Sequence, residues 1–116
     1  MNEIYKLLIN GADANTKDIK DFSLLMNYAS KNDLETVSIL LDFGASINDK
    51  DHLALSALDY AIEKHHLDMV KLLVKNGAAV TNDSYMFAIR KNYRDIVEFF
   101  DTLDPDKYVF LKDRRR

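Results

Sequence analysis

The stretch that decides the fold reads Leu67-Asp68-Met69-Val70-Lys71-Leu72-Leu73-Val74-Lys75-Asn76-Gly77-Ala78. An equivalent stretch runs from Leu34 to Ala45, and a shorter one, residues 4–12, ends in Gly11-Ala12. Successive stretches are 33 residues apart, and each of the three glycines in the chain precedes an alanine at the same point. A fixed period of this length is typical of stacked repeats, because one unit alone cannot bury its apolar face.

Each unit has the apolar spacing of two helices. The second helix carries one apolar face, formed in one unit by Leu34, Val37, Leu40 and Leu41. A shorter helix precedes it, and the sequence predicts such helices from Ser23 to Lys31 and from Ser56 to Lys64, with the serines as N-caps. The turns between paired helices contain Asn32-Asp33 and His65-His66, and we expect a left-handed residue in each turn.

From about Ile4 to Leu103 the sequence resembles the ankyrin-repeat family. Ser56-Ala57-Leu58-Asp59-Tyr60-Ala61 stands where that family has its T-P-L-H-x-A motif, and residues 67–78 resemble its second helix and glycine–alanine turn. The resemblance implies an all-α solenoid of helix-turn-helix units, with hairpin loops that project from one side.

The sequence departs from the family at its loops. Asp21 and Ala54 replace the hairpin glycine, so we expect irregular loop tips. Six residues are missing between Ala79 and Tyr85, so we expect the last hairpin to be reduced to a turn. The family's proline and histidine are also replaced, by Leu24 and Ala57 and by Met26 and Asp59 respectively.

This register predicts one ankyrin-repeat domain over residues 1–103. It contains a half unit at 1–16, full units at about 17–48 and 49–81, and a shortened unit at 82–103. Residues 104–116 form a C-terminal cap or tail. Within them, Tyr108-Val109-Phe110-Leu111 either folds back over the last unit or forms a frayed apolar end. We expect the folded-back arrangement, because four exposed apolar residues favour aggregation.

Composition and charge narrow the class of protein. With 116 residues, 47% of them hydrophobic and 30% charged, the chain has the composition of one globular domain. We expect a cytoplasmic protein with no membrane partner, because no apolar run approaches about 20 residues, no signal peptide is recognisable and cysteine is absent. The net charge of −3 argues against a nucleic-acid partner, although Arg114-Arg115-Arg116 is locally basic.

No residue pattern indicates chemistry. The sequence has no glycine-rich nucleotide motif and no G-x-S-x-G elbow. His65 and His66 are adjacent on one turn, where two side chains rarely converge on a metal. Acidic residues that open the second helices offset the helix dipole, and they are Glu35, Asp68 and Asp95. We therefore expect no enzymatic activity, no metal and no cofactor.

The candidate partner-binding residues lie in two groups. The first is the pair of hairpins, with Ile19, Lys20 and Phe22 in one loop and His52, Leu53 and Leu55 in the next. Exposed apolar side chains at loop tips mark interaction surfaces, although they can also pack between adjacent loops. The second group lies at the C-terminal ends of the first helices and comprises Lys31, Lys64, Arg90 and Lys91. These cations offset the negative end of the helix dipole, or they form a contact ridge for an acidic partner. The two roles are compatible.

Three functions follow from the resemblance. The first is a non-catalytic module that binds another protein through its loop tips and concave face. A sharper form is a small intracellular inhibitor, of the immunity type, that blocks a toxin or a host protein. The alternative class is a self-associating repeat protein, which the truncated first unit favours, although a monomer is the expectation. The identity of the partner is not encoded in the repeat positions.

Overall fold

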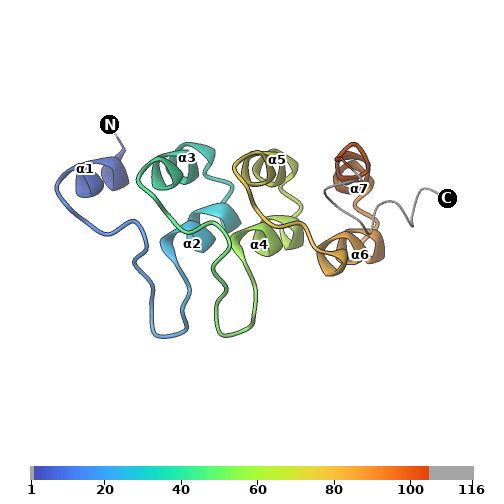
Figure 1. Ribbon diagram of the computed structural model, residues 1–116, viewed down its shortest axis with the longest axis horizontal. Helices are drawn as coiled ribbons and strands as arrows, with labels where there is room; N and C mark the ends of the chain where they lie inside the picture. The colour runs from blue at the N-terminus through green and yellow to red at the C-terminus, as the bar shows by residue number, and fades with distance from the viewer. Residues whose placement is uncertain (1, 105–116) are drawn as a thin grey trace.

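The computed structural model describes residues 2–104 and contains, within that range, seven α-helices and no strand. The helices form two rows (Figure 1). One row contains the second helices α1 (Glu3–Ile9), α3 (Leu34–Asp42), α5 (Leu67–Lys75) and α7 (Arg94–Asp101), and the other the first helices α2 (Leu24–Ser30), α4 (Ala57–Glu63) and α6 (Asn82–Arg90). The molecule is an elongated stack, 51 Å long and 26 by 23 Å across. The all-α solenoid expected from the sequence is confirmed.

Serine or threonine side chains cap the N-terminal ends of the first helices. Ser23 Oγ accepts a hydrogen bond from the N–H of Met26 at 3.2 Å. Ser56 Oγ accepts one from Asp59, whose carboxylate accepts in return from the Ser56 N–H at 3.0 Å. Such a capping box satisfies backbone donors that a helix start otherwise leaves unpaired. The predicted helices 23–31 and 56–64 are therefore confirmed, with their first and last residues as caps.

Left-handed residues stand at repeat-equivalent points of the chain. Asn32 and His65 have φ values of 58° and 60° between their helices, as expected. Asp21 and Ala54 take φ values of 59° and 64°, although neither is glycine. Both hairpins therefore keep the same regular turn, and the expectation of irregular tips is wrong. The physical reason is a pair of aspartates at the start of the turns.

Asp18 and Asp51 hold the two hairpins in shape. Asp18 Oδ1 accepts from two backbone N–H groups of its own loop, at 2.8 and 3.0 Å. Asp51 Oδ1 does the same in the second loop, at 2.9 and 3.0 Å. An aspartate that bonds to the backbone ahead of it mimics a backbone turn and compensates for the missing glycine.

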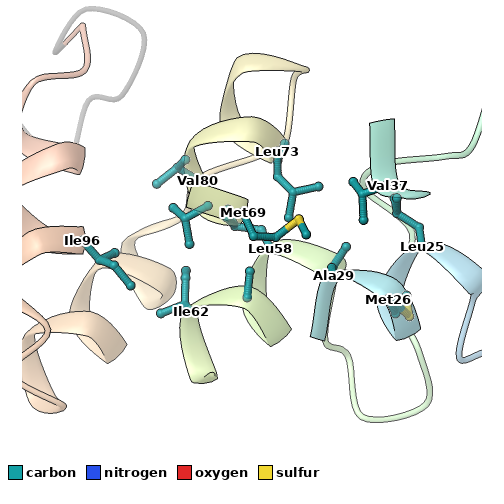
Figure 2. Packing of buried hydrophobic residues seen from close by; sticks show 14 of the residues in the cluster. Leu25, Met26, Ala29, Val37, Leu58, Ile62, Met69, Leu73, Val80 and Ile96 are labelled. Atoms are coloured by element: carbon teal, nitrogen blue, oxygen red, sulfur yellow. The ribbon is translucent and has the colours of Figure 1, made fainter. Parts of the chain in front are cut away.

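The core runs between the two rows of helices and continues from one unit to the next as a single cluster, part of which is shown in Figure 2. Repeat-equivalent residues of the second helices, Leu40, Leu73 and Phe100, are fully buried. The equivalent residue in α1 is Leu7, which is 57% exposed, and within residues 2–104 no first helix precedes α1 to cover it. Burial in this fold therefore depends on the first helix of the same unit as well as on the neighbouring units.

Asparagine side chains link the ends of successive units. Asn15 Oδ1 accepts from the Ser46 N–H at 2.7 Å, and its amide donates to the Gly44 carbonyl at 3.2 Å. Asn48 repeats both bonds in the next unit, with Ala79 at 2.8 Å and Gly77 at 3.2 Å. Each asparagine thereby pairs two backbone groups that the turn after a second helix leaves free.

The last unit is shorter on the loop side. Residues 43–56 connect α3 to α4 through a hairpin that projects beyond the row of first helices (Figure 1). Residues 76–81 connect α5 to α6 without a hairpin, and Thr81 caps α6 directly. Helix α6 has nine residues against seven in α4, so part of the former loop is helical. The expected fold-back of Tyr108–Leu111 lies outside the described residues.

Ala54→Gly should stabilise the protein. A residue with a Cβ atom in the left-handed region destabilises the folded state by about 1–2 kcal/mol. Glycine gives the unfolded chain more conformational freedom than alanine, which lowers the free energy of unfolding by about 0.4–1 kcal/mol. We expect a net gain of about 0.5–1 kcal/mol in the free energy of unfolding, measured by urea denaturation. Ala79→Gly is the matched control, since Ala79 is also exposed but has no positive φ, and it should destabilise. An equal loss in both variants would contradict strain at Ala54.

Candidate interaction surface

Two hairpins stand side by side and form the projecting edge of the molecule. The first hairpin comprises residues 17–23, closed by a bridge between Lys17 and Ser23, and the second comprises residues 50–56. The His52 N–H donates to the Lys20 carbonyl at 2.9 Å, which joins the two backbones. Lys17 Nζ lies 2.9 Å from Asp49 Oδ2 below this contact. The tips are thus held relative to each other by backbone and side-chain bonds.

The tips expose two aliphatic side chains. Ile19 is 91% exposed and Leu53 is 74% exposed. Lys20 is also exposed, and His52 Nε2 lies 3.4 Å from a carboxylate oxygen of Asp21. The tips therefore present apolar side chains among charged ones, an arrangement typical of protein-binding patches.

Phe22 does not belong to the exposed tip. Its ring packs edge-to-face on Tyr60, with ring centroids 5.3 Å apart at 84°. The repeat-equivalent residue of Phe22 is Leu55, which is likewise half-buried. Phe22 lies at the base of the hairpin and packs against helix α4, which differs both from an exposed tip and from packing between adjacent loops.

A tyrosine–aspartate hydrogen bond anchors the second hairpin to α4. Tyr60 Oη donates to Asp51 Oδ2. Burial raises the pKa of the Tyr60 hydroxyl, and the hydrogen bond to Asp51 and its negative charge raise it further, to about 12. Partial burial pushes the pKa of Asp51 up, but hydrogen bonds from Tyr60 and from hairpin N–H groups outweigh it and hold that pKa below its usual value.

The basic residues of the ridge end the first helices. Lys31, Lys64 and Lys91 are the C-caps of α2, α4 and α6. Lys31 Nζ lies 5.4 Å from the Tyr28 ring centroid. Two cations flank the Phe87 ring, the Lys91 ammonium at 5.7 Å and the Arg90 guanidinium at 5.8 Å. Aromatic rings thus orient three of the four cations while leaving them exposed.

The adjacent histidines connect units. His65 stacks on Tyr93 at 4.0 Å, and its Nε2 lies 2.8 Å from Asp95 Oδ1. Desolvation pushes the pKa of Asp95 up, but the hydrogen bond from His65, the Ile96 N–H and the charge of His65 together outweigh it and leave the pKa below its usual value. His66 Nε2 lies 3.2 Å from the Ser30 carbonyl. Among residues 2–104, no group of three or more metal-binding side chains gathers at one place.

A hollow of about 480 Å³ lies beside the second hairpin, and the sequence analysis did not identify it. It opens between that hairpin and α6, where the shortened unit has no hairpin of its own. Its lining mixes apolar side chains with charges of both signs and includes Lys50, Leu55, Asp83, Phe87 and Arg90. The six-residue shortening was the signal that could have predicted it.

A second surface also escaped prediction. Tyr5 and Ile9 of α1 and Phe43 after α3 are exposed on the row of second helices, and the Tyr5 and Phe43 ring centroids are 6.1 Å apart. The positions equivalent to Tyr5 and Ile9 hold Ser38 and Asp42 in the next unit. Comparing the units position by position would have revealed this exchange of polar for apolar residues.

Comparison with protein families bears on the part of the stack from α1 to the start of α6. Residues 1–84 match the family model described as "Ankyrin repeats (3 copies)". No curated protein sequence matches the chain closely enough to count as a relative. Within the described part of the chain, no helix has the length and apolar character needed to cross a membrane.

Tyr60→Phe should destabilise the protein and raise the pKa of Asp51. Loss of this hydrogen bond removes about 1 kcal/mol from the free energy of unfolding at neutral pH. The pKa of Asp51 is lower in the folded protein than in the unfolded chain. Its contribution to the free energy of unfolding is therefore fully present above the unfolded-state pKa, and it is lost as the pH falls through the folded-state pKa. The difference between the variants should therefore shrink in acid.

Urea denaturation at pH 7 and pH 3, together with NMR titration of the Asp51 carboxyl carbon, measures both effects. Tyr28→Phe is the control, because the Tyr28 hydroxyl has no hydrogen-bond partner within residues 2–104. A Tyr60→Phe penalty that stays constant over this pH range would show that Asp51 is not the group responsible.

Proposed function

Because the chain belongs to the ankyrin-repeat family, whose members generally mediate protein–protein interactions, we propose that it is a non-catalytic module that binds a protein partner through its two hairpins and the basic ridge. The observation that carries this proposal is the exposure of Ile19 and Leu53 on hairpins that are joined to each other. Apolar side chains held in place lose little freedom on binding, which favours their use as anchors.

The basic ridge favours a partner that has an acidic surface. Lys31, Lys64 and Lys91 recur at one repeat position, and the stacking of α2, α4 and α6 brings that position into one row (Figure 1). A row of like charges attracts an oppositely charged partner and raises its association rate. The hairpin tips then supply the apolar centre of the interface, and the ridge supplies its charged rim.

The finer forms of the proposal differ in what binding does. As a small intracellular inhibitor of the immunity type, the protein would block the activity of the toxin or host protein that it captures. The absence of cysteine is in keeping with the reducing interior of a cell. An activity assay of the captured protein, with and without this chain, separates inhibition from scaffolding.

Self-association is the second candidate, and one observation favours it. Leu7 is 57% exposed, whereas its equivalents Leu40 and Leu73 are fully buried. Gel filtration over a range of concentrations distinguishes the two functions, because a concentration-dependent dimer supports assembly and a constant monomer supports binding to another protein.

Ile19→Asp combined with Leu53→Asp should abolish capture of the partner from lysate of the source cell. Both side chains are exposed, so the fold should be retained, which circular dichroism and urea denaturation verify. Ile9→Asp is the matched control, since Ile9 is 53% exposed on the other row of helices. Retention by the double variant, or loss by the control, would move the site away from the hairpin tips.

Replacing Lys31, Lys64 and Lys91 by glutamine should slow association with the captured partner about tenfold at low salt. Dissociation should change little, because exposed rim charges act mainly on the association rate. Stopped-flow or surface-plasmon measurements at two salt concentrations give both rates. The control variant carries glutamine in place of Lys6, Lys71 and Lys75, which lie on the second-helix row. An equal slowing of association in this control would show that the effect depends on net charge and not on the ridge.

A further inference from the structure

The shortened last unit leaves one edge of the second hairpin without its neighbour. In the first hairpin, the Lys20 carbonyl accepts the His52 N–H at 2.9 Å. The residue equivalent to Lys20, 33 positions later, is Leu53. By repeat symmetry its carbonyl faces the side where a third hairpin would stand, and no hydrogen bond to it forms within residues 2–104.

The space beside this edge is open. The notch, as we call it, is the hollow of about 480 Å³ whose lining includes Lys50, Leu55, Asp83, Phe87 and Arg90. One wall is the second hairpin, and the other is α6. The residues equivalent to 48–53 are those that the last unit lacks, so the notch occupies the position of the missing hairpin.

The charges of the notch favour a peptide over a phosphate-rich ligand. Lys50 and Arg90 are balanced by Glu63 and Asp83 in the same lining. Asp59 also borders it, but its carboxylate already accepts from Ser56 and Ser84. A lining without excess positive charge does not select nucleic acid or an anionic membrane.

We propose that the notch binds an extended peptide segment of the partner, which adds as a strand to the open edge of the second hairpin. The peptide donates a main-chain N–H to the Leu53 carbonyl and places an apolar side chain between Leu55 and Phe87. The contact between the two hairpins already uses this type of bond, so the peptide continues an interface that the fold itself contains. This inference rests on the proposed function, since it assigns the class of segment that a protein partner presents.

The probe is a capped synthetic peptide with the sequence of residues 49–56, which carries the donor that His52 supplies to the first hairpin. Titrated into ¹⁵N-labelled full-length protein, it should shift the amide signals of residues 53–56 and 83–87. A peptide N-methylated on its donor edge should bind about tenfold more weakly, because main-chain hydrogen bonds are lost. Equal binding by both peptides, or no shift in these two segments, would overturn the proposal.

An insertion variant tests the same site from within the chain. A copy of residues 48–53 placed between Val80 and Thr81 restores the 33-residue spacing and supplies the third hairpin. This variant should no longer bind the peptide. Continued binding to the folded variant contradicts the proposal, and the N-methylated peptide on the native chain decides the matter if the variant does not fold.

Partner capture separates this inference from the proposed function. If Ile19→Asp with Leu53→Asp loses the partner while the insertion variant retains it, the hairpin tips bind the partner and the notch proposal fails. If the insertion variant loses the partner as well, the notch takes part in the interface. If the native chain captures no protein, the proposed function fails, whatever the peptide titration shows.

Discussion

Burial between neighbouring units is the constraint on which the rest of the structure depends. Leu40 and Leu73 are fully buried because a first helix of their own unit and the adjacent units surround them, whereas no first helix precedes α1 among residues 2–104 and Leu7 is exposed. The same residue type at the same repeat position thus differs in burial solely through its neighbours. Stability of this kind accumulates along the stack, so the ends are where the chain departs from its own pattern.

Polar bonds fix the register that apolar burial leaves open. The amides of Asn15 and Asn48 join the glycine–alanine turns at Gly44 and Gly77 to the preceding unit, and the His52 N–H joins the two hairpins. Apolar contacts are non-directional, whereas these bonds require one spacing and one orientation. Thr81 caps α6 without an intervening hairpin, so the contact between hairpins ends after the second one.

The end of this contact gives the proposed binding surface its particular shape. A regular third hairpin would fill the space beside α6, whereas the shortened unit leaves the notch next to the exposed Leu53 tip. The hairpin tips, the basic ridge and the notch therefore lie on the side of the loops and first helices. Tyr5, Ile9 and Phe43 form a separate apolar surface on the second-helix row, and nothing in the structure shows what covers it.

The sequence by itself determined the stack: the 33-residue period, the helix limits at Ser23 and Ser56, and the left-handed turns at Asn32 and His65 all depend on local spacing and local backbone preference. The tertiary structure decided which candidate side chains are free to bind. The sequence placed Phe22 at a hairpin tip, whereas in the structure its ring packs on Tyr60. Ala54 adopts a regular turn because Asp51 accepts hydrogen bonds from the loop backbone. The notch between the second hairpin and α6 required both walls to be placed. Exposure and cavities depend on contacts between residues far apart in the chain, which periodicity does not encode.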